Sequence, residues 1–357
     1  MTPLADRSSG KTSTPRRKIP RWGGVVALAS FGIVVTAVTV AASALSDVDG
    51  ITSDGTVRLP APVSAPRPGP GAGSLPSRPG TVGIAGLAGP GWTVTEHRLT
   101  SQQSQRDYLL ARPVTVTVRP LPVLVVLHGR RMTPAQTARL SGFPALLRQA
   151  IVVYPAGLGD SWNAGACCGA AHALGTNDVQ FVTDVVGNVL STQRDASPTS
   201  VFLVGYSNGG RLAYQMACLR PGLFAAVAVV EAVPVASCSQ TVPVPLLVVA
   251  SAGDPFVNLD GRRPRTVIGG YVEPTVDQVL REWRTRDGCA PSANVTIAGE
   301  LTATTWAGCR SPAQVEFDLY AGNRHQWPIG NAATPSAQAE SWAFFQRISR
   351  AATRRAP

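Results

Sequence analysis

Short apolar runs alternate with longer amphipathic segments from residue 92 to residue 351. An apolar run bounded by Gly or polar residues is typical of a strand that is buried on both faces. Such runs lie at residues 122–128, 150–154, 200–205, 225–230, 244–250 and 315–320, after an opening hairpin at residues 92–100 and 108–111. Apolar residues at helical spacing predict helices at residues 134–149, 178–192, 208–219, 276–286 and 337–351. The alternation predicts an α/β fold with a mostly parallel sheet and helices on both faces.

The N-terminal 45 residues have a different pattern. Residues 23–45 carry no charge and are long enough to cross a bilayer as a helix, for which about 20 apolar residues suffice. Six cations precede them in residues 1–22, so we expect a signal peptide or a single membrane anchor that places the rest of the chain outside the cytoplasm. The small residues 42–44 (ASA) fit a cleavage site, whereas the length of the apolar run fits a retained anchor. The predicted location is extracellular or at the cell surface.

Residues 46–91 are rich in Pro and Gly and poor in large apolar side chains. Such a composition buries too little surface to offset the entropy of ordering, so this segment is predicted to be a disordered linker. The chain is therefore divided into a basic segment with a signal or anchor at 1–45, a linker at 46–91, and one folded domain at 92–357.

The net charge of +11 comes mainly from the two ends of the chain. Residues 1–22 hold six cations and residues 347–355 hold four arginines, whereas the region between them has no run of like charge. A nucleic-acid-binding domain is expected to present a basic face or a recognisable module, and neither is found. Nucleic acid is therefore excluded as a partner, while the oligomeric state stays open.

Six cysteines in an exported chain predict disulfides. Cys289 and Cys309 are expected to pair, because they bracket strand-like residues at 295–297 and 302–305. No Cys-x₂-Cys pair stands near another, and His172 alone lies close to Cys167 and Cys168, so a zinc site is not predicted. No metal or cofactor is expected.

The strongest chemical signal is G-x-S-x-G at residues 205–209 (GYSNG), between a strand-like and a helix-like segment. This pattern forms a sharp strand-to-helix turn that exposes a nucleophilic serine, here Ser207. Ser hydroxyls need a base, and in this arrangement the chain order is Ser, acid, His. His325 is the only histidine after Ser207 and is the predicted base.

The predicted acid is Asp254, because it directly follows the apolar run at 244–250 that lies between Ser207 and His325. Asp260 is the competing acid, and Asp277 is a weaker one because it lies in a predicted helix. The oxyanion hole is expected from the backbone N–H of Asn208 and of Arg130 or Arg131.

Residues 161–169 (SWNAGACCG) join a predicted strand to a helix on the side where ligands bind in open α/β sheets. They either line a substrate cleft, with Trp162 and Asn163 as contacts, or form a loop tied by a disulfide. Trp327, close to the predicted base, is a third expected substrate contact. His128 ends a buried strand, and we interpret it as a loop-packing residue rather than a catalytic one.

The chain resembles α/β-hydrolase esterases of the polyhydroxybutyrate depolymerase and feruloyl esterase group. The resemblance covers residues 92–345 and rests on VVLHG at 125–129, SWNAGACCG at 161–169, NDVQF at 177–181, GYSNGG at 205–210, GDP at 253–255, Cys289 with Cys309, and RHQWP at 324–328. It implies the α/β-hydrolase fold and the same nucleophile, acid and base. Arg324 and Gln326 depart from the usual family pattern near the base, which affects the expected substrate preference.

These observations predict an exported serine carboxylic ester hydrolase that works through an acyl-enzyme on soluble or oligomeric esters. Two alternatives stay open. An acyltransferase would use the same acyl-enzyme, and a cell-surface binding protein would use the hydrolase fold without turnover.

Overall fold

The computed structural model describes residues 86–310, 314–322 and 324–353. The predicted apolar segment at 23–45 and residues 46–85 of the predicted linker lie outside these ranges. Leu87 and Ala88 are buried in a core cluster, so the packed chain begins a few residues before the predicted boundary at residue 92. Across the ranges that the structure describes, no helix is long and apolar enough to span a membrane.

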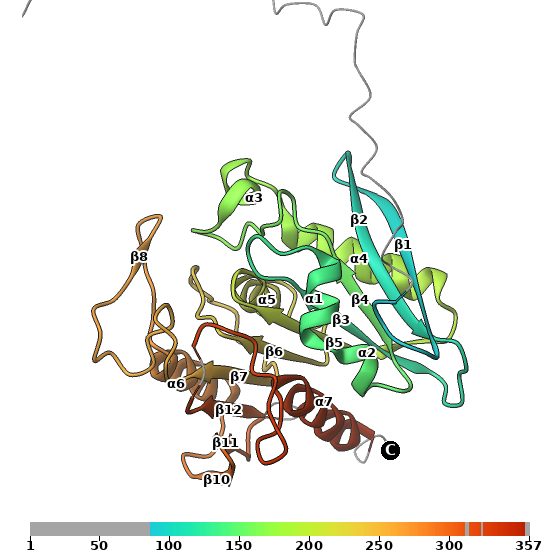
Figure 1. The fold of residues 1–357 in the computed structure, drawn as a ribbon. Coiled ribbons are helices and arrows are strands. Elements are labelled where there is room, and N and C mark those ends of the chain that lie inside the picture. Colours follow the sequence, from blue (N-terminus) through green and yellow to red (C-terminus); the bar gives the residue numbers. More distant parts are fainter. Residues whose placement is uncertain (1–85, 311–313, 323, 354–357) are drawn as a thin grey trace, which may run out of the picture. The chain divides into compact units, whose positions relative to one another are not determined.

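Ten strands form one sheet in the order β1-β2-β4-β3-β5-β6-β7-β12-β11-β10 (Figure 1). The six central strands, from β4 to β12 in this order, run parallel, and the flanking strands pair antiparallel. The strands are β1 Trp92–Ser101, β2 Ser104–Pro113, β3 Leu121–Leu127, β4 Ile151–Pro155, β5 Ala196–Tyr206, β6 Ala226–Val230, β7 Leu246–Ser251, β10 Ala293–Ala298, β11 Leu301–Trp306 and β12 Val315–Tyr320. Two short strands, β8 Val267–Ile268 and β9 Tyr271–Val272, form a separate ribbon.

Seven helices accompany the sheet in the described residues: α1 Pro134–Ser141, α2 Phe143–Leu146, α3 Gly169–Ala173, α4 Asp178–Thr192, α5 Asn208–Leu219, α6 Val276–Asp287 and α7 Ala337–Thr353. Alternate residues of β3 enter different cores, as the period of a strand requires. Val123 and Val125 belong to the cluster that includes α4, α5 and α6, and Leu124 and Val126 belong to the cluster that includes α1, α2 and α7. Helices therefore cover both faces of a mostly parallel sheet, and the predicted α/β class is confirmed.

Two local differences from the predicted helices have simple causes. The helix expected over residues 134–149 is broken at Gly142, whose φ of 60° ends α1, and the short α2 begins at Phe143 with Pro144 in its first turn. The short helix α3 was not expected, because its five residues are too few for a periodic pattern.

Disulfides join all six cysteines of the chain. Cys289 pairs with Cys309, as predicted. Cys218 pairs with Cys238, and the adjacent residues Cys167 and Cys168 pair with each other.

Candidate active site

Ser207 lies at the turn between β5 and α5, at the carboxyl ends of the central strands. Its φ of 52° is in a region that non-glycine residues rarely adopt. The turn is tight because a Cβ on Gly205 would collide with the carbonyl oxygen of Gly209, and a Cβ on Gly209 would lie 2.5 Å from the carbonyl oxygen of Leu127. Glycine is therefore required at both positions, and the turn presents Ser207 to a cleft.

His325 approaches Ser207 from the loop that follows β12. The His325 Nε2 lies 2.8 Å from the Ser207 Oγ, which is hydrogen-bond distance. The Tyr206 hydroxyl donates to the His325 carbonyl oxygen at 3.2 Å, and the Phe256 ring packs edge-on against the imidazole with 5.0 Å between ring centroids. The structure thus brings the predicted base to the predicted nucleophile.

Asp254 lies in the turn after β7, and its side chain is fully buried. Its Oδ2 is 2.7 Å from the His325 Nδ1, and its Oδ1 accepts the backbone N–H of Phe256 at 2.7 Å. Burial raises the pKa of Asp254, but hydrogen bonds with His325, Glu231 and the Phe256 backbone outweigh burial and lower the pKa. Asp254 is therefore ionised at neutral pH and can stabilise a protonated His325.

The two alternative acids lie elsewhere. Asp260 is exposed, and its carboxylate is occupied locally by the Arg262 backbone N–H at 3.0 Å and by the Arg262 guanidinium at 3.0 Å. Asp277 is exposed in the first turn of α6. Of the three aspartates, the structure places Asp254 against His325.

Glu231 was not predicted to belong to this site. It follows β6, the strand beside β5, and its carboxyl group is buried with the Ser251 hydroxyl and the Ser251 backbone N–H as donors. Burial and then a hydrogen bond with Asp254 raise the pKa of Glu231 to about 9. Glu231 is thus protonated at neutral pH and donates to Asp254. The sequence signal was a lone acid at the end of the apolar run at 225–230.

The geometry favours Arg130 over Arg131 as the second oxyanion donor. The Arg131 N–H already donates to the Asp160 carbonyl oxygen at 2.7 Å. Arg130 follows the carboxyl end of β3 and lines the same cleft as Ser207. Asn208, the first donor, is the first residue of α5, where backbone N–H groups lack partners inside the helix.

His128 packs the loop that carries Arg130. Its Nε2 accepts the Gly157 N–H at 2.9 Å, and its Nδ1 donates to the Gly129 carbonyl oxygen at 2.9 Å. Burial lowers the pKa of His128 to about 4, so the ring is neutral and both nitrogens are used. The loop-packing interpretation of His128 agrees with this geometry.

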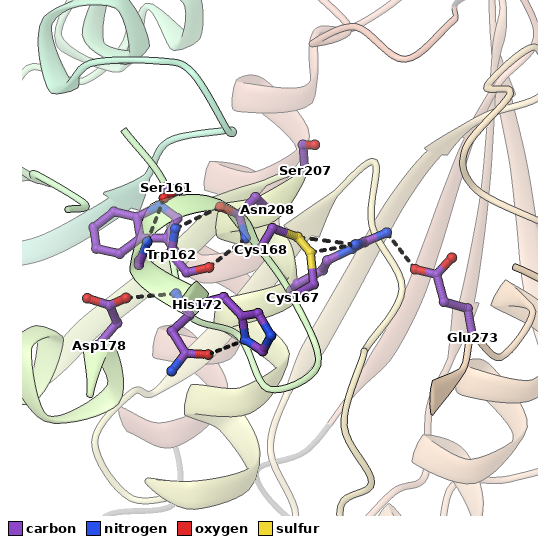
Figure 2. Close-up of a disulfide and its surroundings, with 12 residues drawn as sticks. Ser161, Trp162, Cys167, Cys168, His172, Asp178, Ser207, Asn208 and Glu273 are labelled. Carbon is purple, nitrogen blue, oxygen red and sulfur yellow. Dashed lines mark hydrogen bonds and ion pairs between the residues drawn. A yellow bond between two sulfur atoms is a disulfide. The ribbon is translucent and has the colours of Figure 1, made fainter. Parts of the chain in front are cut away.

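Trp162, predicted to contact substrate, is instead completely buried. Figure 2 shows it beside Asn208, whose side-chain amide accepts the Trp162 N–H at 2.8 Å and donates to the Trp162 carbonyl oxygen at 3.0 Å. The Trp162 indole donates to the His128 carbonyl oxygen at 2.9 Å. A direct contact with substrate is therefore not supported, because Trp162 ties the loop at 161–169 to α5 and to the end of β3.

Asn163 and Trp327 also lie outside the lining of the cleft. Asn163 is tied to Asp178, which accepts its backbone N–H at 2.8 Å. Trp327 is buried and donates from its indole to Gln338 at 2.9 Å. Both residues make their hydrogen bonds with the protein around the site, so the geometry does not support a direct contact of either with substrate.

A cleft of about 630 Å³ opens in front of Ser207. Its walls include the Cys167–Cys168 disulfide, the side chain of Arg211 from α5, and the exposed ring of Phe256. Figure 2 shows the Cys167–Cys168 disulfide near Ser207 and His172, which line the same cleft. The Nη1 atom of Arg211 lies 3.0 Å from the Sγ atom of Cys167. The loop at 161–169 is thus both tied by a disulfide and part of the cleft, although its tryptophan is not.

Two groups of side chains have ligand atoms spaced closely enough for a metal ion in the described residues. One is Glu231 with Asp254 and His325, whose atoms make the hydrogen bonds given above. In the other, Glu316 is bound by Arg347 at 2.6 Å. Asp318, beside it, is fully buried, and burial raises its pKa well above the usual range. Burial therefore favours the protonated form of Asp318 beside the Glu316–Arg347 ion pair.

The solved structure of acetyl xylan esterase from Aspergillus awamori superimposes on this chain with a TM-score of 0.51 at 14% identity, over 71% of this chain and 99% of that one. The chain has the α/β-hydrolase fold. No protein-family model matches the sequence.

Curated relatives of this α/β-hydrolase chain carry esterase names. NocK of Nocardia uniformis subsp. tsuyamanensis, named as an esterase, is 28% identical over 229 residues, which are 58% of this chain and 66% of that protein. Feruloyl esterase C of Emericella nidulans is 28% identical over 200 residues, which are 55% of this chain and 64% of that protein. The chain thus spans slightly less than two thirds of the length of these relatives, and the resemblance to α/β-hydrolase esterases is confirmed.

Proposed function

We propose that this protein is an exported serine carboxylic ester hydrolase that acts through an acyl-enzyme on soluble or oligomeric esters. The observation that carries the proposal is the chain of contacts from Ser207 Oγ to His325 Nε2 at 2.8 Å and from His325 Nδ1 to Asp254 Oδ2 at 2.7 Å. The esterase names of the relatives support the same reaction class.

In this mechanism Ser207 Oγ attacks the carbonyl carbon of the ester while His325 Nε2 accepts the hydroxyl proton. The backbone N–H groups of Asn208 and Arg130 stabilise the resulting oxyanion. The protonated imidazole then donates its proton to the departing alcohol oxygen as the carbon–oxygen bond breaks, which leaves an acyl group on Ser207. Water repeats the sequence and releases the acid. Asp254 stays ionised throughout and holds the imidazole in the required tautomer.

Export is supported by two features of different kinds. All six cysteines are paired, which is common in secreted proteins and rare in cytosolic ones. The apolar segment at 23–45 supplies a signal or an anchor that would direct export.

The test combines labelling with turnover. A fluorophosphonate should label Ser207 in the wild-type chain and leave a Ser207→Ala variant unlabelled. The wild type should hydrolyse 4-nitrophenyl butyrate, methyl ferulate or hydroxybutyrate oligomers, and Ser207→Ala should lose about 10⁴-fold or more in kcat. Unchanged circular dichroism and Tm in the variant would show that the fold is intact. Labelling of another residue, or activity within about a thousandfold of wild type in Ser207→Ala, would refute the assignment.

A further inference from the structure

We propose that the cleft binds esters that carry a carboxylate near the scissile bond, in preference to neutral esters of the same shape. This inference rests on the proposed ester hydrolase function and names its substrate class. It starts from the charges that line the cleft, which are strongly biased toward one sign.

Three arginines line the cleft: Arg130, Arg131 and Arg211. They come from two different segments, the loop after β3 and the first turn of α5, and both segments contribute to the site around Ser207. Among the described residues, Glu231 is the only acid in the lining, and burial together with Asp254 raises its pKa to about 9. The lining is therefore cationic, although the central part of the chain is nearly neutral in sequence.

Of the three arginines, Arg211 already has an ion-pair partner in the protein. Arg130 and Arg131 are therefore the two that can bind an anion of the substrate. The Arg211 guanidinium forms an ion pair with the nearly buried Glu273. Burial lowers the pKa of Arg211, Glu273 raises it, and the charge of Arg130 lowers it again. The last effect means that the guanidinium groups of Arg130 and Arg211 are close enough to repel each other.

Arg130 and Arg131 have no ion-pair partner among the residues that the structure describes. Arg130 extends along the wall of the cleft beside the disulfide, because its Cδ would lie 3.8 Å from a Cβ built on Gly169. Arg131 has a φ of 65°, which is uncommon for a non-glycine residue. Because Arg130 and Arg131 carry no ion pair in the described residues, and Arg130 also lies near the positive charge of Arg211, they favour the arrival of an anion.

The chemistry of arginine narrows the class of anion. A guanidinium presents parallel N–H donors that match the two oxygens of a carboxylate, and such bidentate bonds are about twice as strong as neutral hydrogen bonds. The Arg130 side chain leaves the backbone at the predicted oxyanion donor, so a carboxylate bound by it lies close to the scissile carbonyl. Monoesters of dicarboxylic acids and hydroxy-acid oligomers with a free acid end both meet this requirement.

The experiment uses two pairs of esters with the full chain. On the acyl side, mono-4-nitrophenyl adipate is compared with its methyl ester, and on the alcohol side, 4-carboxyphenyl butyrate is compared with its methyl ester. The measured quantity is the ratio of kcat/KM for the acid over kcat/KM for the neutral partner. We expect a ratio of about 10 or more in at least one pair, mainly through KM, and a fall of several-fold between 0.02 and 0.5 M NaCl because salt screens charges.

Arg130→Gln and Arg131→Gln should each reduce this ratio by several-fold. Arg139→Gln removes the same charge from an exposed position on α1 outside the cleft lining, and it should leave the ratio unchanged. Hydrolysis of all four esters with ratios near one, or a preference that survives both cleft substitutions, would overturn the inference while the ester hydrolase function stands. If none of the four esters were hydrolysed, both the carboxylate preference and the ester hydrolase function would be overturned.

Discussion

Glu231 donates a hydrogen bond to Asp254, so two carboxyl groups share one buried site behind His325. Two adjacent carboxylates cannot both ionise at low cost, and here their surroundings separate their pKa values. Asp254 accepts a backbone N–H and the imidazole and stays charged, whereas Glu231 accepts from Ser251 and keeps its proton. The protonated Glu231 therefore stabilises the ionised form of Asp254.

This relationship predicts a pH-dependent contribution to stability. The pKa of Glu231 is about 9 in the folded chain, against an ordinary value of 4.5. Between these values the folded chain holds a proton that the unfolded chain has lost, so the stability due to this proton is complete below pH 4.5 and falls as the pH rises toward 9. Glu231→Gln keeps a donor toward Asp254 and cannot ionise. The Tm of the variant minus that of the wild type should therefore increase from pH 5 to pH 9.

Glu96→Gln is the matched control, because Glu96 is exposed on β1. Its Tm should stay close to that of the wild type, because surface substitutions usually have small effects. Glu231→Ala removes the donor altogether and should reduce kcat by about 10- to 100-fold, since a hydrogen bond to a charged group contributes about 1.5–3 kcal/mol. A constant Tm difference for Glu231→Gln would contradict the protonated state of Glu231.

Asp254 and Asp260 should differ sharply on substitution. Asp254→Asn is expected to lower kcat by about 10⁴-fold with little change in KM, because an amide favours the wrong imidazole tautomer and cannot stabilise the imidazolium. Asp260→Asn should change kcat less than about twofold, because surface substitutions usually have small effects. Steady-state kinetics on 4-nitrophenyl butyrate measures both. If Asp260→Asn lowered kcat strongly and Asp254→Asn did not, the catalytic acid would be Asp260 and the assignment of Asp254 would be wrong.

The side chain of Asn208 should contribute to the stability of the fold, in addition to the proposed role of its backbone N–H in the oxyanion hole. Its side-chain amide satisfies both backbone groups of the fully buried Trp162. Asn208→Ala leaves the buried Trp162 N–H without a partner, which costs about 1–3 kcal/mol, whereas the Trp162 carbonyl oxygen keeps the Cys168 N–H as a donor at 3.0 Å. Urea unfolding measures this loss, and Asn294→Ala, at an exposed position of β10, serves as the control with an expected change within about 0.5 kcal/mol. Equal stability of the two variants would show that the hydrogen bonds between Asn208 and the Trp162 backbone do not stabilise the fold.

The disulfides Cys289–Cys309 and Cys218–Cys238 offer a matched pair, because both have a sequence separation of 20. Loop-closure entropy predicts a loss of about 3 kcal/mol when either pair is replaced by serine, which corresponds to about 5–10 °C in Tm for a domain of this size. Calorimetry of the two double-serine variants measures the losses. A change of under 1 °C in either variant would show that its bridge does not constrain the unfolded chain.

Much of the fold and the reactive centre was predictable from the sequence because the relevant signals are local. Apolar runs of strand length and helical periodicity predicted the α/β class, and the G-x-S-x-G turn pointed to Ser207 because two glycines are needed there for steric reasons. His325 followed by elimination, since it is the only histidine after Ser207. Asp254 followed from its place at the end of a strand.

The tertiary structure decided everything that depends on neighbours distant in sequence. It placed Asp254 rather than Asp260 against His325, because the turn after β7 faces the loop after β12, and β7 and β12 pair in parallel. It buried Trp162 and Trp327, whose apolar rings are more stable inside the protein than in an open cleft. It also brought Glu231 to Asp254, since β6 pairs with β7. A residue pattern specifies the type and order of elements, but contacts between side chains depend on which strand ends lie side by side.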